Sequence, residues 1–130
     1  MGDANADGGG GNGGLLEVRE ERAEGGAMVL SIEGELDLAT APKVREPLEE
    51  GIEAGAQHIV VDMLGCGFID STGLGVLLHV AKRLEENGGA MALVCVDDQI
   101  KRLLELTMID RTIPVYETRE EALAAISGAA

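Results

Sequence analysis

Residues 57–62 form a nearly continuous apolar run, and a helical pattern follows after a short loop, from Val76 to Glu86. A strand that is apolar at almost every position is typical of a sheet centre, because neither of its faces meets water. Strands of this kind that alternate with helices build α/β domains. This segment therefore favours an α/β fold, with helices packed on the faces of a sheet.

The patterns on either side predict one α/β domain with five strands and four helices. Strands are expected at residues 15–22, 27–33, 57–62, 90–96 and 112–116. Helices are expected at residues 42–54, 98–106 and 118–126, and another helix follows the Ser71 loop and ends near residues 87–89. Alternating strands and helices imply right-handed crossovers and a mainly parallel sheet. Only a turn at Gly25-Gly26 separates the first two strands, so they add an antiparallel hairpin at the sheet edge. Residues 34–39 are expected to be a loop, and a short loop is expected between the third strand and the second helix.

Local signals mark the ends of three of these helices. Thr40 is expected to cap the first helix, and Pro42 fits its first turn. Pro47 lies inside the same helix and removes one hydrogen bond, which predicts a kink or a divided helix. Asn87-Gly88-Gly89 is a typical C-terminal signal and is expected to end the second helix. Residues 118–121 form a capping box for the fourth helix.

Composition separates a tail from the domain. Half of residues 1–14 are glycine, and Asp, Asn and Ala make up most of the rest. Such a segment cannot bury enough apolar surface to offset its ordering entropy, so it is expected to be a disordered tail. It also lacks the charged start and apolar centre of a secretory signal. Residues 15–130 are long enough for one domain with its own core.

The formal net charge of −14 argues against nucleic acid and anionic membranes as partners, because both require a basic surface. The charge favours a basic partner or, equally, a solvated acidic surface without a specific role. No apolar run approaches the roughly 18 residues that a membrane span needs. The two cysteines, Cys66 and Cys95, are expected to be ordinary reduced thiols in a cytoplasmic protein.

No motif predicts catalysis, a metal or a cofactor. Gly65-Cys66-Gly67 begins like a dinucleotide-binding fingerprint, but Asp70 stands where the third glycine is needed. His58 and His79 have no partner at the spacing of metal ligands. Asp37 and Asp70 are weak candidates for an acid/base pair, since nothing supplies a nucleophile beside a base. The chain is therefore expected not to be an enzyme.

Two hydroxyls, Ser71 and Thr72, lie where the loop passes into the second helix. The first N–H groups of a helix have no internal partners and carry partial positive charge, so a phosphate is tolerated there. Ser71 is thus a candidate phosphorylation switch, with Thr72 the less favoured hydroxyl. The alternative is plain capping of the helix by Asp70 or by Ser71 itself.

The second helix has two distinct faces at 100° per residue. One face should pack on the sheet and carries Leu74, Leu77, Leu78, Ala81 and Leu84. The opposite face carries Thr72, Val76, His79 and Arg83. Val76 is therefore expected to point outward, beside Gly73 and Gly75, as part of a docking face for a protein partner. The alternative is an isolated exposed valine, which is common.

Asp37 lies in the loop after the second strand. In an open parallel sheet, the loops after the carboxyl ends of the strands gather at one edge, where sites usually form. Asp37 and Ser71 could therefore be neighbours. The alternative, equally weighted, is that Asp37 only bonds to its own turn.

Three stretches together identify a family. Residues 34–42 (GELDLATAP), 59–63 (IVVDM) and 68–77 (FIDSTGLGVL) resemble a STAS domain, and more narrowly the stand-alone bacterial anti-sigma factor antagonists. Residues 104–107, 114–116 and 120–123 match the C-terminal part of the family. The resemblance covers about residues 15–127. Met108 departs from it, because the family usually has glycine at this position.

The resemblance implies the STAS fold and a phosphorylation-controlled binding protein. The unphosphorylated form would bind an anti-sigma factor, itself an ATP-dependent serine kinase, and so free a sigma factor. The kinase would phosphorylate Ser71 and dissociate, and a metal-dependent phosphatase would reset the protein. The residues expected to bind the partner are Asp37, Thr40, Asp70, Ser71, Thr72, Gly73, Leu74, Gly75, Val76 and His79.

Two other functions remain open for a STAS domain. The chain could be a constitutive subunit of a larger complex, such as a lipid-transport complex or a stress-sensing scaffold, with a partner indifferent to Ser71. It could also bind a nucleotide or another small molecule at the same sheet edge, although no basic residue near Ser71 supports this.

Overall fold

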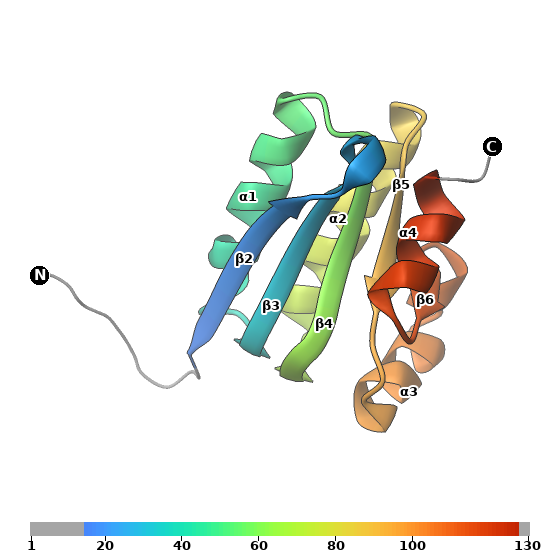
Figure 1. Ribbon diagram of the computed structural model, residues 1–130. Helices are drawn as coiled ribbons and strands as arrows, with labels where there is room; N and C mark the ends of the chain where they lie inside the picture. Colours follow the sequence, from blue (N-terminus) through green and yellow to red (C-terminus); the bar gives the residue numbers. More distant parts are fainter. Residues whose placement is uncertain (1–14, 128–130) are drawn as a thin grey trace, which may run out of the picture.

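The computed structural model describes residues 15–127, which form one sheet with helices on both faces (Figure 1). Its strands are β2 (Leu16–Arg22), β3 (Met28–Leu36), β4 (His58–Ile69), β5 (Ala90–Val94) and β6 (Val115–Tyr116). Its α-helices are α1 (Ala41–Glu53), α2 (Ser71–Glu86), α3 (Asp98–Leu106) and α4 (Arg119–Ser127), with short 3-10 helices η1 (Glu24–Gly26) and η2 (Ile109–Arg111). The predicted disorder of residues 1–14 lies outside the described residues.

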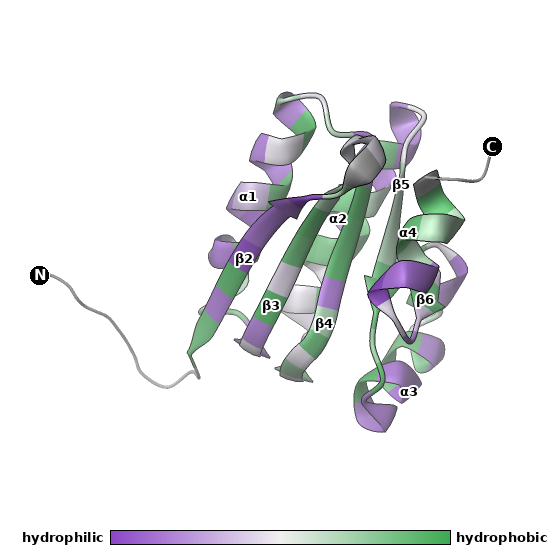
Figure 2. Cartoon of the chain, in the orientation of Figure 1, coloured by the Kyte–Doolittle hydropathy of each residue, from purple (hydrophilic) through white to green (hydrophobic). Residues whose placement is uncertain are grey.

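The five strands are ordered β2-β3-β4-β5-β6 across the sheet. β2 pairs with β3 in antiparallel orientation, and the other neighbours pair in parallel. The predicted α/β architecture, with an antiparallel hairpin at the edge of a mainly parallel sheet, is confirmed. Figure 2 shows that this edge strand is largely hydrophilic, whereas β3 and β4 carry long hydrophobic stretches.

β3 and β4 run further than the sequence pattern predicts. β3 takes up half of the expected loop at residues 34–39, and β4 takes up nearly all of the short loop expected between residue 62 and the second helix. The register explains the error in β4. Ser31 pairs with Asp62 but Glu33 pairs with Gly65, and the register shifts again between Gly34 and Glu35. Each shift adds one residue to β4, as a β-bulge does. The extra residues interrupt the alternation by which a strand is recognised.

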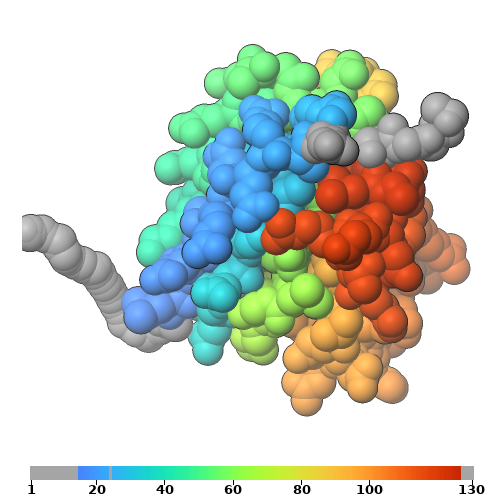
Figure 3. Space-filling view, in the orientation of Figure 1, coloured from blue at the N-terminus to red at the C-terminus, as the bar shows by residue number. Residues whose placement is uncertain are grey.

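The main core lies between the sheet and helices α1, α2 and α3. β3 and β4 send alternate side chains into it, and the helices contribute residues such as Val44, Leu77 and Leu104. The opposite face carries a smaller core, in which Val29 and Val60 lie under Ala122 of α4. Because α4 is short, it covers only part of this face (Figures 1 and 3).

Pro47 does not divide the first helix, since α1 continues without a break from Ala41 to Glu53. A proline removes one hydrogen bond, but Val44 and Leu48 on either side of it are fully buried in the main core. Burial of these neighbours holds the turn in place despite the missing bond.

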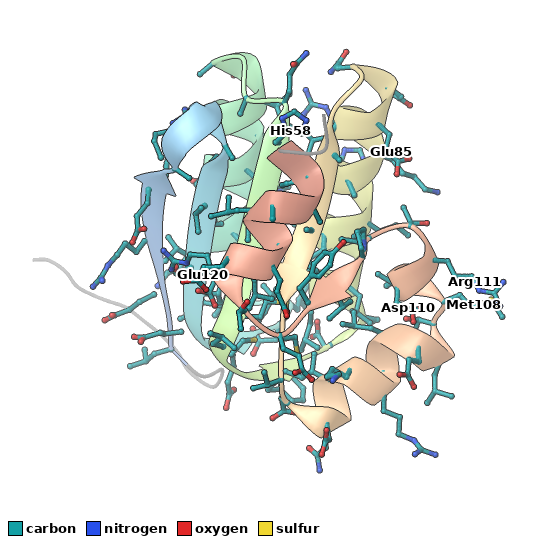
Figure 4. All side chains as sticks on the ribbon, turned by 45° about the vertical axis from the view of Figure 1, so that its right-hand side comes forward. His58, Glu85, Met108, Asp110, Arg111 and Glu120 are labelled. Carbon is teal, nitrogen blue, oxygen red and sulfur yellow. The ribbon has the colours of Figure 1, made fainter. Side chains whose placement is uncertain are left out.

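Met108 offers a test of backbone strain at the corner between α3 and η2, where Figure 4 shows it beside Asp110 and Arg111. It adopts a left-handed conformation, with φ of 63°, and its side chain is 57% exposed. This conformation costs an L-residue about 1–2 kcal/mol, while glycine adopts it freely. Met108→Gly is therefore expected to raise the melting temperature by a few degrees, as measured by thermal circular dichroism.

The control for this substitution is Met108→Ala, which also removes the exposed side chain but keeps the Cβ that causes the strain. It should bring no stabilisation. Equal melting temperatures for the glycine and alanine variants would show that strain at residue 108 is negligible.

Candidate partner-binding site

The Asp70 carboxylate ties together the two loops that follow β3 and β4. One oxygen accepts a hydrogen bond from the N–H of Gly73 at 3.0 Å, which caps α2. The other accepts from the N–H of Leu38 at 3.1 Å. Of the two capping alternatives, Asp70 is thus the cap, and Ser71 is left as the first residue of the helix.

Asp37 bonds to its own turn. Its Oδ1 accepts hydrogen bonds from the N–H groups of Ala39 and Thr40, both at 3.0 Å. Thr40 is the N-cap residue of α1, as expected, but its side chain makes no capping bond because the hydroxyl points back toward β3. It donates to the carbonyl of Glu35 at 2.7 Å and accepts from the N–H of Asp37 at 2.9 Å. This closed turn holds residue 38 against Asp70, so the loop of Asp37 lies beside that of Ser71.

Ser71 presents a free hydroxyl at the start of α2. The residue is exposed, and among residues 15–127 its side chain has no hydrogen-bond partner. Thr72 is half-buried. The Ser71 oxygen is therefore open to an approaching enzyme, at a helix end where the backbone favours negative charge.

Two glycines next to this hydroxyl have opposite surroundings. A Cβ on Gly73 would lie 2.6 Å from Cγ of Leu36, 2.9 Å from the Leu36 carbonyl oxygen and 3.0 Å from Cγ1 of Ile69. A Cβ on Gly75 would meet nothing within 4 Å. The first turn of α2 is thus pressed against the ends of β3 and β4 through Gly73, while Gly75 faces outward.

The expected exposure of Val76 is wrong: the residue is only 7% exposed and belongs to the main core. The helical wheel assumed that the sheet is the only neighbour of α2. In the structure α1 packs along α2 as well, with an ion pair between Arg83 and Glu49 at 3.9 Å. The outward stripe of α2 instead consists of Ser71, Gly75 and His79, one helical turn apart.

The residues predicted to bind a partner are therefore divided by burial. Ser71, Gly75 and His79 are exposed, and Asp37, Asp70 and Thr72 are half-buried beside them. The side chains of Thr40, Leu74 and Val76, and the Cα of Gly73, are buried. These buried residues shape the site and cannot offer side chains to a partner.

Two apolar side chains beside the site were not singled out from the sequence. Leu38 is 73% exposed and lies where its backbone meets Asp70. Phe68 is 46% exposed at the end of β4. Both lie in segments that carry the family resemblance, so these segments contained the information needed to find them. An apolar pattern, however, cannot distinguish an exposed phenylalanine from a buried one.

The two thiols are poorly suited to reaction. Cys66 and Cys95 are both buried and free, and burial raises the pKa of each. The neutral thiol is therefore favoured, and it is a weak nucleophile. In the described part of the chain, no group of three or more His, Cys, Asp or Glu side chains is placed to hold a metal ion. No described helix is long and apolar enough to cross a membrane.

Comparison with known proteins gives consistent matches. A model of the family described as STAS domain matches residues 19–122. The anti-sigma F factor antagonist of Paenibacillus polymyxa is 33% identical over 109 residues, which are 83% of this chain and 91% of that protein.

Solved structures agree with these sequence matches. An anti-sigma factor antagonist from Mycobacterium paratuberculosis has a TM-score of 0.80 at 27% identity, over 86% of this chain and 94% of the other. The phosphorylated form of the Bacillus cell fate determinant SpoIIAA has a TM-score of 0.67 at 20% identity, over 84% and 98%, and so shares the fold.

Proposed function

The chain belongs to the STAS domain family, among the anti-sigma factor antagonists, and from that premise we propose that it binds an anti-sigma factor and thereby frees a sigma factor. The partner is a serine kinase that uses ATP to phosphorylate Ser71, and a metal-dependent phosphatase removes the phosphate. The chain itself provides a binding surface and a substrate hydroxyl, without catalysis of its own.

The exposed, unbonded hydroxyl of Ser71 carries this proposal. It directly follows Asp70, which ties together the two loops of this edge, so a partner seated on the edge would cover it. Of the two neighbouring hydroxyls it is the more accessible, because Thr72 is half-buried. The rigid turn around Asp37 supports the same edge from the side of β3.

Phosphorylation would act by exclusion. A phosphoryl group adds about 1.5 to 2 negative charges at neutral pH. Both oxygens of the adjacent Asp70 carboxylate accept hydrogen bonds from backbone N–H groups. Neither bond brings a positively charged side chain that could offset the charge of the phosphate. Burying the added charge in an interface should cost several kcal/mol. Exclusion of this kind needs no change of the fold.

The direct test is mass spectrometry of the protein isolated from its own organism, from growing and from stressed cells. We expect a fraction of molecules heavier by ~80 Da, the mass of one phosphoryl group, with fragmentation placing it on Ser71. A phosphate on Thr72 would support the same mechanism, with Thr72 instead of Ser71 as the phosphorylated residue. Repeated absence under both conditions would contradict the switch and favour a constitutive subunit.

A further inference from the structure

On the sheet face that carries α4, one arginine at the start of this helix bonds to side chains of three strands. Arg119 donates hydrogen bonds from Nη2 to Ser31 Oγ and to Asp62 Oδ2, both at 3.0 Å. Its Nη1 donates to Glu21 Oε1 at 2.7 Å. The bond to Asp62 is the chief cause of the raised pKa of the guanidinium. With two carboxylates on one arginine, the positive charge is already neutralised.

Beyond α4 the same face is uncovered (Figure 3). Glu33 lies over Gly65, where a Cβ would come within 2.7 Å of the glutamate Cγ. Phe68 pairs with Glu35 at the end of β4, on the side of the sheet opposite to the main core. Leu64, which is 50% exposed, lies between the arginine and the phenylalanine along the strand.

This uncovered surface combines apolar side chains with negative charge. It borders a hollow of about 250 Å³, whose lining includes four carboxylates and two guanidinium groups. The carboxylates belong to Glu17, Glu21, Glu33 and Asp62, and the guanidinium groups to Arg19 and Arg119. Because Arg119 is neutralised by its partners, the remaining charge is negative, in a chain with a net charge of −14. A complementary segment would carry Lys or Arg together with apolar side chains.

The surface is continuous with the edge around Ser71. Phe68 is separated from Ser71 by two residues, of which Ile69 is buried and Asp70 ties the loops together. Leu38 extends the apolar area on the side of β3. A partner seated on Ser71 could therefore reach around the end of the sheet to Phe68.

We propose that the uncovered sheet surface formed by Glu33, Leu64 and Phe68 is a second part of the anti-sigma factor interface, and that it takes a basic segment with apolar side chains. The inference rests on the proposed function. Phe68 is exposed in the free protein, and the partner would cover it as the aromatic anchor that dominates the affinity of many interfaces. Ser71 controls whether the interface can form. Affinity and switching would thus come from opposite sides of the sheet.

The test is calorimetric titration of the full chain with the anti-sigma factors of its own organism, one at a time, followed by variants against the one that binds. Phe68→Ala should weaken binding about 10- to 30-fold. Glu33→Lys, on an exposed residue, should weaken it several-fold and flatten its dependence on salt. The matched control is Leu106→Ala, which removes an equally apolar, 70% exposed side chain on α3 and should bind like the parent.

The outcomes separate the inference from the function. If the parent binds while Phe68→Ala and Glu33→Lys bind equally well, the inference is overturned and the proposed function stands. If the parent binds none of the anti-sigma factors, both are overturned. Thermal melting of each variant checks folding, and Glu33→Lys decides the matter if Phe68→Ala is unstable.

Discussion

Ser71→Asp is expected to weaken binding of the anti-sigma factor by about two orders of magnitude, whereas Ser71→Ala keeps the affinity of the parent and cannot be switched off. The aspartate places a fixed negative charge where the free hydroxyl now lies, next to the Asp70 carboxylate. Burying that charge without a partner costs a few kcal/mol, and each ~1.4 kcal/mol is a factor of ten in affinity. The phosphoryl group, with nearly twice the charge, should have a larger effect.

Calorimetric titration and incubation with ATP measure the two halves of this prediction. Ser71→Ala should gain no phosphate when the kinase and ATP are present. The matched control is Gln99→Asp, which adds the same charge at an exposed position of α3 and should leave binding unchanged. Parent-like binding by both Ser71 variants would rule out exclusion as the mechanism.

Gly73→Ala is expected to lower the free energy of unfolding by about 2–3 kcal/mol, the upper range for an overpacked site. The new Cβ would lie 2.9 Å from a backbone carbonyl oxygen of Leu36 and even closer to the Leu36 side chain. The carbonyl cannot move, because it already accepts the N–H of Asp70 at 3.1 Å. Thermal circular dichroism should show a melting temperature lower by roughly 10 °C.

Gly75→Ala is the matched control, because it makes the same chemical change one half-turn further along α2. Its Cβ meets no atom within 4 Å, and alanine favours a helix over glycine by up to about 1 kcal/mol. This variant should therefore melt at a higher temperature than the parent. If the two variants melt alike, the start of α2 is not pressed against the sheet as described.

The position of Ser71 could be predicted from the sequence because the signals that fix it are local. The carboxylate of Asp70 caps α2 by accepting a hydrogen bond from the N–H of Gly73, only three residues further along the chain. The Asn87-Gly88 signal ends the same helix. The prediction for Val76 failed because α2 packs on α1 as well as on the sheet, and α1 lies far away in the chain. No pattern within α2 reports a second packing partner.

β4 shows a different limit. Met63, Cys66 and Ile69 all reach the main core although they are three residues apart. If Gly65 and Gly67 are skipped, the segment from Met63 to Ile69 alternates regularly between apolar core positions and the opposite face. The two extra residues of the bulges hid a strand whose side chains otherwise alternate between the two faces of the sheet.

The shortness of α4 also matters while the protein is being made. Every element of the main core precedes residue 119, so this core can form as soon as that much chain has left the ribosome. Val29, Val60 and Val94 stay in contact with water until α4 brings Ala122 over them. A nascent or truncated chain that stops before Arg119 thus combines a finished core with a bare apolar sheet face, and such a surface is prone to aggregate.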